Sequence, residues 1–139
     1  MSDTELVRDY LHRDHADLLA TVEQCADAVA AGWGGETTSD RSAVVPPLEA
    51  ALRRSGVTDR LPAVLAGAVS AIGGQLQARP VAGPPYVVVT SVGPVLRATL
   101  ADRRLVVTFG VFTVRREGDG PRYARRSAPD ADLVDVAFR

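Results

Sequence analysis

Two histidines are the first residues of this chain whose types and spacing suggest chemistry. His12 and His15 lie three residues apart in a helical pattern, and Asp9, Asp14 and Asp17 flank them. Side chains three apart on a helix point to one side, so the pair and a carboxylate would supply three metal ligands. A small-molecule or metal-dependent activity near this pair is therefore one hypothesis. No second cluster of Cys or His accompanies it, so we expect neither a metal nor another cofactor.

The arginines form the second group of interest. All sixteen basic residues are arginine, and residues 95–128 carry eight of them against three acids in a chain of net charge −1. A sheet that presents arginines can bind nucleic acid through its phosphates. The candidate residues for this second hypothesis are Arg103, Arg104, Arg115, Arg116, Arg122, Arg125 and Arg126. Neighbouring strand residues point to opposite faces, so each Arg-Arg doublet would be divided between faces, and protection of sheet edges is the competing explanation.

Common catalytic and nucleotide-binding patterns are absent from the sequence. It contains no Gly-x-Ser-x-Gly, no P-loop and no Gly-x-Gly-x-x-Gly. Cys25, the only cysteine, lies in a helical apolar seam, where a small buried hydrophobe is the ordinary role. Asp130, Asp132 and Asp135 are interpreted as solubilising the terminal loop and strand. We therefore assign no catalytic residue, and the sequence favours a non-catalytic role over an enzymatic one without deciding between them.

The N-terminal half predicts a helical layer. Residues 2–31 indicate one long helix, because Ser2-x-x-Glu5 matches a capping box and apolar residues follow at spacings of three and four. Trp33, in a glycine-rich loop, is interpreted as an aromatic plug that closes this layer. Two shorter helices are predicted at 48–55 and 60–77, with Pro62 in the first turn of the latter. Small residues along this last helix favour close approach of a neighbour.

The C-terminal half predicts an antiparallel sheet. From residue 80 the apolar period becomes two, and strands are expected at 86–91, 95–100, 105–116, 122–126 and 133–138, with 122–126 at an edge. Tight turns between consecutive strands favour a meander of about five strands. The fold class is therefore α+β in a single domain, 1–139, with a helical half, 1–79, and a sheet half, 80–139. Its expected core includes Leu11, Leu18, Val22, Val107, Phe109 and Val136.

The strand predicted at 105–116 is apolar on both faces. One face carries Leu105, Val107 and Phe109, and the opposite face carries Val106, Phe112 and Val114. The helices of the chain can cover one face, which leaves the other for a partner. We therefore predict an interface at Val106, Phe112 and Val114, and a non-catalytic interaction domain that self-associates through its sheet as a homo-oligomer, or binds another protein.

Composition and a family resemblance complete the expectations. The polar, acidic N-terminus does not match a signal peptide, and the longest apolar stretch is too short to span a bilayer, so we expect a cytoplasmic chain with no membrane partner. The run from Pro84 to Arg97, together with the absence of lysine, resembles an uncharacterised family of small proteins from halophilic archaea. That resemblance covers the C-terminal half and implies no activity.

Overall fold

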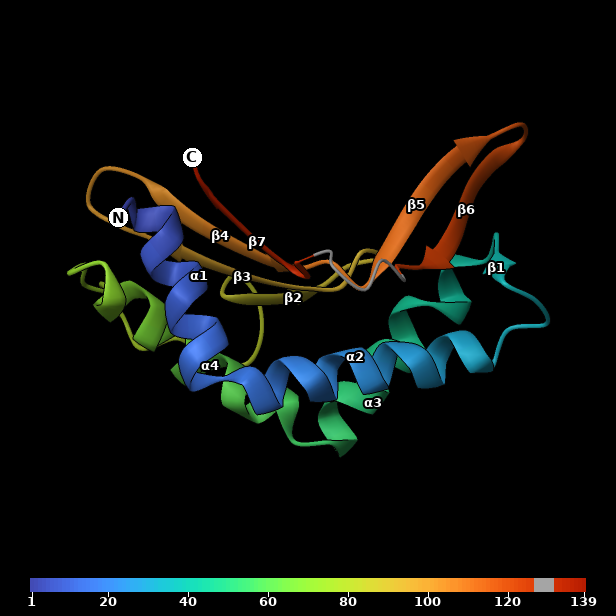
Figure 1. Cartoon of the computed structure of the whole chain (residues 1–139), viewed down its shortest axis with the longest axis horizontal. Coiled ribbons are helices and arrows are strands. Elements are labelled where there is room, and N and C mark those ends of the chain that lie inside the picture. The colour runs from blue at the N-terminus through green and yellow to red at the C-terminus, as the bar shows by residue number, and fades with distance from the viewer. Residues whose placement is uncertain (127–131) are drawn as a thin grey trace.

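The computed structural model describes residues 1–126 and 132–139, and it confirms the α+β class (Figure 1). Helices come first and antiparallel strands, in two sheets, follow them. The helices are α1 Asp3–Asp14, α2 Ala16–Ala31, the 3₁₀ helix η1 Arg41–Ala43, α3 Val45–Arg54 and α4 Val57–Ala71. The strands are β1 Thr37–Thr38, β2 Val87–Val89, β3 Pro94–Thr99, β4 Arg104–Phe109, β5 Phe112–Glu117, β6 Gly120–Arg125 and β7 Val134–Phe138.

The helix predicted over residues 2–31 is divided at His15. The capping box is present, because Ser2 Oγ accepts from the Glu5 amide at 3.2 Å and the Glu5 carboxylate faces the Ser2 amide. His15 leaves helical geometry, with φ −132° and ψ 30°, so α1 and α2 form an angle (Figure 1). As a result α1 lies against α4 and β7, whereas α2 lies against α3 and β6. A straight helix would not follow both surfaces.

The two later helices also differ from their predicted bounds. Gly56, at φ +83°, lets α4 begin at Val57, earlier than the expected cap at Thr58 or Asp59. Pro62 consequently lies inside α4 and not in its first turn, which corrects the prediction. A proline there removes one backbone donor from the helix. The helix nevertheless continues through Pro62 and packs against α1 and α3.

The single meander is wrong, because the strands form two sheets. The four-stranded sheet has the order β2-β3-β4-β7, and the three-stranded sheet has the order β1-β6-β5. The strand predicted over 105–116 ends at Phe109 and restarts at Phe112, where the chain passes from one sheet to the other. The last strand, β7, returns to pair with β4, and β6 is central instead of an edge.

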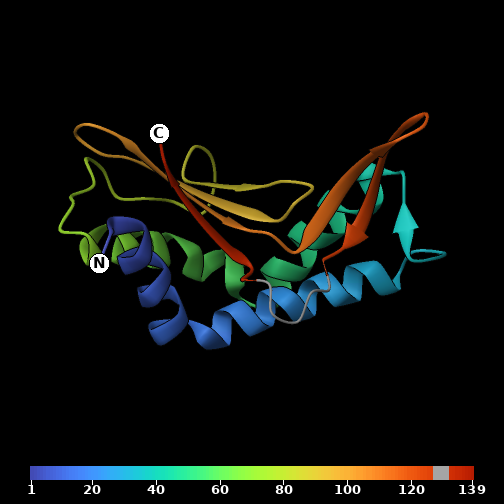
Figure 2. The same cartoon turned by 45° about the horizontal axis from the view of Figure 1, so that its top comes forward.

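The core lies between the helices and one face of the four-stranded sheet. All six residues expected there are buried, with Leu18, Val107 and Phe109 fully enclosed. The turned view in Figure 2 shows α2 running beneath both sheets. At its far end the Trp33 indole donates to the Ala43 carbonyl at 2.8 Å and its ring lies 5.6 Å from that of Phe112. These contacts confirm the interpretation of Trp33 as a plug.

Candidate interaction surface

The three predicted interface residues do not share a face. Phe112 is 1% exposed and packs on Trp33, so its assignment to an interface is wrong. The physical reason is the break after Phe109, which places Phe112 at the start of a different sheet. Val114 is half-buried against the core from this second sheet. Val106 alone lies on the open side of the four-stranded sheet.

Strand register defines that open side, which we call the outer face. Across it Val88 is paired with Val95 and Val95 with Thr108, while Val106 is paired with Ala137. None of the four apolar residues belongs to the core cluster formed with the helices. Val95 is buried by its neighbours, and the other three are half-buried. Figures 1 and 2 show helices on the opposite side of this sheet only.

Charged side chains lie at the two ends of the outer face. Asp135 is the register partner of Thr108 at one end. At the other end Arg104 is bonded to Arg139 through two backbone hydrogen bonds, of 2.7 and 2.9 Å. Arg97 is opposite Val106 on the neighbouring strand. All four charged residues are exposed. The outer face therefore has an apolar centre of Val88, Val95, Val106 and Ala137, with Asp135 at its acidic end and Arg104 and Arg139 at its basic end, while Arg97 lies in the same row as Val106 and Ala137.

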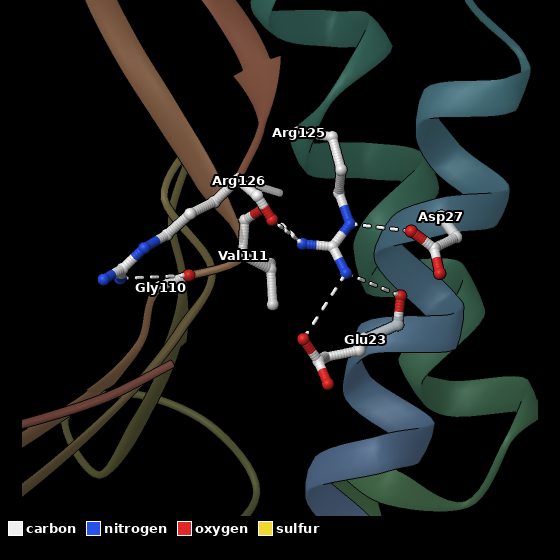
Figure 3. A network of polar contacts seen from close by, with 6 residues as sticks. All are labelled: Glu23, Asp27, Gly110, Val111, Arg125 and Arg126. Atoms are coloured by element: carbon white, nitrogen blue, oxygen red, sulfur yellow. Dashed lines mark hydrogen bonds and ion pairs between the residues drawn. The ribbon is translucent and has the colours of Figure 1, made fainter. Parts of the chain in front are cut away.

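Four of the seven predicted nucleic-acid-binding arginines have partners within the chain. Arg103 pairs with Asp3 and lies 4.0 Å above the Phe138 ring, and Arg122 donates to the Thr37 hydroxyl at 2.7 Å. Arg125 and Arg126 bind protein atoms around the sheet junction (Figure 3).

The remaining three predicted arginines are exposed, but two different sheets carry them. Arg104 belongs to β4, whereas Arg115 and Arg116 lie on β5. The described residues thus do not gather the predicted set onto one surface, and nucleic-acid binding stays a prediction.

The two histidines contact different partners. His12 Nε2 lies 3.0 Å from Asp132 Oδ1, and the other carboxylate oxygen of Asp132 is 2.8 Å from Arg8 Nε. His15 Nε2 instead lies 2.8 Å from the Tyr10 hydroxyl. Within residues 1–126 and 132–139 no three His, Cys, Asp or Glu side chains are grouped as a metal site.

Three further expectations concern Cys25, Asp130 and the absence of a membrane span. Cys25 is buried, with its sulfur 3.6 Å from the Ser55 hydroxyl oxygen. Asp130 lies outside the described residues. In the described part of the chain, no helix combines the length and apolarity that crossing a bilayer requires.

Sequence reasoning missed the contribution of residues 76–86 to a concave site. Arg97 and Arg104 line a pocket with Gln77 and Tyr86, both of which precede β2. The alternation of β3 places Arg97 and Thr99 on one face, but nothing local in the sequence shows that the 76–78 segment lies opposite them.

Comparison with protein-family models assigns the chain to a family. The family model of a domain of unknown function, DUF7988, matches residues 5–139, and the protein belongs to this family. Neither the comparison with curated proteins nor that with solved structures found a match. The family therefore supports the expectation of an uncharacterised domain, while the halophilic archaeal origin remains a prediction.

Proposed function

We propose that the protein is a non-catalytic interaction domain that forms a homodimer through the outer face. The observation that carries the proposal is the apolar centre at Val88, Val95, Val106 and Ala137, which spans all four strands and does not contribute to the core of its own chain. An apolar strip of this kind favours contact with a second apolar surface. The predicted interface is thereby moved from Phe112 and Val114 to the four-stranded sheet.

Charge placement favours a second copy as the partner. Asp135 lies in β7 and Arg139 directly follows its last residue, Phe138, so the two are at opposite ends of the outer face. A two-fold axis that runs across the strands between two facing sheets brings Asp135 of one copy opposite Arg139 of the other, twice. In this arrangement Val106 and Ala137 lie on the axis and meet their own counterparts, and so does Arg97, which shares their register row. The charge complementarity of the outer face therefore rests on the two Asp135–Arg139 pairs.

Charge exchange tests this arrangement. Asp135→Arg and Arg139→Asp should each weaken dimerisation by at least about tenfold, because each replaces attraction by repulsion across the interface. The double variant should restore dimerisation, because it exchanges the two charges. Sedimentation velocity over a range of protein concentrations measures the dimerisation constant.

The matched control is Arg116→Asp, on the other sheet, which should leave that constant unchanged. Val106→Glu should give a folded monomer by circular dichroism, since Val106 does not contact the core cluster. A wild-type chain that stays monomeric at hundreds of micromolar overturns the proposal. So does a double variant no better than either single change.

A further inference from the structure

A pocket of about 300 Å³ lies where the 76–78 segment passes beside the basic end of the outer face. Pro85 and Tyr86, which precede β2, complete its wall with residues of β3 and the first residue of β4. The lining side chains are Leu76, Gln77, Ala78, Pro85, Tyr86, Arg97, Thr99 and Arg104. Arg97 and Arg104 are the only charged residues among them, so the pocket is positively charged without an acidic counterpart in its lining.

Strand register brings these two arginines together. Thr99 is the register partner of Arg104, and Arg97 precedes Thr99 by two residues, so both arginines project from the outer face of adjacent strands. Such diagonal neighbours are within reach of one another for long side chains. Two guanidinium groups at this separation repel each other unless an anion lies between them.

The contrast with nearby arginines is informative. Arg103, next in sequence to Arg104, is paired with Asp3, and Arg125 has two acidic partners. Among the described residues, neither Arg97 nor Arg104 has a side-chain hydrogen bond or an ion pair. Both side chains line the pocket, and no acceptor among the described residues is paired with them, which leaves their donors available to an anionic ligand.

We propose that this pocket binds a phosphomonoester of a small organic molecule. Two guanidinium groups match the two negative charges of a phosphomonoester, whereas a single carboxylate would neutralise only one. The Thr99 hydroxyl and the Gln77 amide add uncharged donors beside them. Leu76, Pro85 and the Tyr86 ring supply an apolar wall for the organic part.

Phenyl phosphate is the probe, because it joins a phosphomonoester to a small apolar ring. Titration followed by amide NMR should show saturable one-to-one binding in the millimolar range, with shifts at Gln77, Tyr86 and Thr99. Arg97→Gln and Arg104→Gln should each weaken binding about tenfold or more, through loss of charge-assisted hydrogen bonds. Both residues are exposed, so both variants should keep the wild-type amide spectrum outside the pocket.

Arg116→Gln, an exposed arginine on β5, is the matched control and should bind phenyl phosphate as the wild type does. An equal loss in this control would identify general charge attraction and overturn the pocket. Inorganic phosphate that binds as tightly as phenyl phosphate would overturn the role of the apolar wall. No saturation by phenyl phosphate overturns the proposal outright. Arg97 and Arg104 project from the face that the proposed dimer covers, so the Asp135→Arg variant distinguishes the two proposals: it should weaken dimerisation and bind phenyl phosphate at least as well as the wild type.

Discussion

Among single residues, Gly67 determines how closely α1 approaches α4. The sequence predicted that small residues along this helix would accept a neighbouring backbone, whereas the structure places the side chain of Tyr10 there. The Tyr10 hydroxyl also lies 2.8 Å from His15 Nε2, at the break between α1 and α2. Burial, with a contribution from Asp14, raises the pKa of Tyr10, so the phenol stays neutral in this contact.

Gly67→Ala should therefore destabilise the fold. A Cβ at this position would lie 2.5 Å from Tyr10 Cζ and closer still to its hydroxyl, so Tyr10 must move and release His15. We expect a loss of about 1–3 kcal/mol in the free energy of unfolding, measured in urea. Alanine is ordinarily better than glycine inside a helix by about 1 kcal/mol, so a more stable variant would contradict the close contact. Gly34→Ala, where a Cβ meets no atom, is the control.

Burial was predictable residue by residue, but side-chain partners were not. Leu18 and Phe109 were identified because apolar periodicity depends only on local geometry. The pairs Arg125–Asp27 and His12–Asp132 join residues about a hundred positions apart in the chain. Such contacts depend on how whole elements pack, so the sequence could not distinguish Arg125, which is held, from Arg104, which is free of a protein partner among the described residues.

At the scale of elements, the break at His15 was invisible for a physical reason. The His15 amide still donates to the Leu11 carbonyl, and the Leu19 amide to the His15 carbonyl, at 3.0 Å each. His15 thus caps the end of α1 and the start of α2, and no loop residue separates the two helices. The apolar seam keeps its spacing of three and four although the axis turns, and periodicity therefore predicts one helix.

The boundary between β4 and β5 was hidden in the same way. Residues 105–114 form an almost continuous apolar and β-branched run, yet the Gly110 amide donates to the Leu133 carbonyl and the amides of Val111 and Phe112 donate to the Val92 carbonyl. These bonds come from distant segments and end the β4 ladder. The pairing of β7 with β4 is equally non-local, so no feature of either strand alone could predict it.

The 3₁₀ helix η1 allows a prediction of pH dependence. The Asp40 carboxylate accepts from the Ser42 hydroxyl at 2.6 Å and from the Ser42 amide at 2.9 Å, and these bonds lower the pKa of Asp40. Because its pKa is lower in the folded than in the unfolded chain, Asp40 adds stability above the unfolded pKa. That contribution is lost as the pH falls through the folded pKa.

Ser42→Ala should raise the pKa of Asp40 toward its ordinary value, since it removes the hydroxyl donor. Carbon-detected NMR titration of the side-chain carboxyl resolves the change. Asp17 provides the internal comparison: its pKa is lowered through a hydrogen bond from Arg60 and should not respond to the substitution. An unchanged Asp40 titration would show that Ser42 does not hold this carboxylate.

At the scale of the whole molecule, two sheets diverge from one short junction, and Arg125 ties the smaller sheet to α2 (Figure 3). Its side chain is 18% exposed. Nε donates to Asp27 at 2.9 Å, and Nη1 donates to the carbonyls of Val111 and Arg126 at 3.0 and 2.6 Å. The Glu23 carboxylate is 3.7 Å from Nη2. One guanidinium thus links β6, the strand junction and the helix beneath.

Arg125→Gln should loosen the β5–β6 hairpin selectively. Glutamine cannot reach the same carbonyls and carboxylates together, so the Val111 carbonyl and two acidic side chains lose their common donor, at a cost of roughly 2 kcal/mol. Amide hydrogen exchange should accelerate in β5 and β6, while β3 and β4 keep their protection, because those strands are held by core packing that Arg125 does not contact.

Arg122→Gln is the matched control, since Arg122 lies on the same strand but its side chain donates only to the Thr37 hydroxyl among described residues. Uniform acceleration across both sheets would instead mean that the two sheets unfold as one cooperative unit and that Arg125 stabilises all of it. The expected local response follows from the topology: β5 and β6 share no ladder with the four-stranded sheet, so their attachment depends on Arg125, on the junction at Val111 and on the packing of Phe112 and Tyr123 against the helical side.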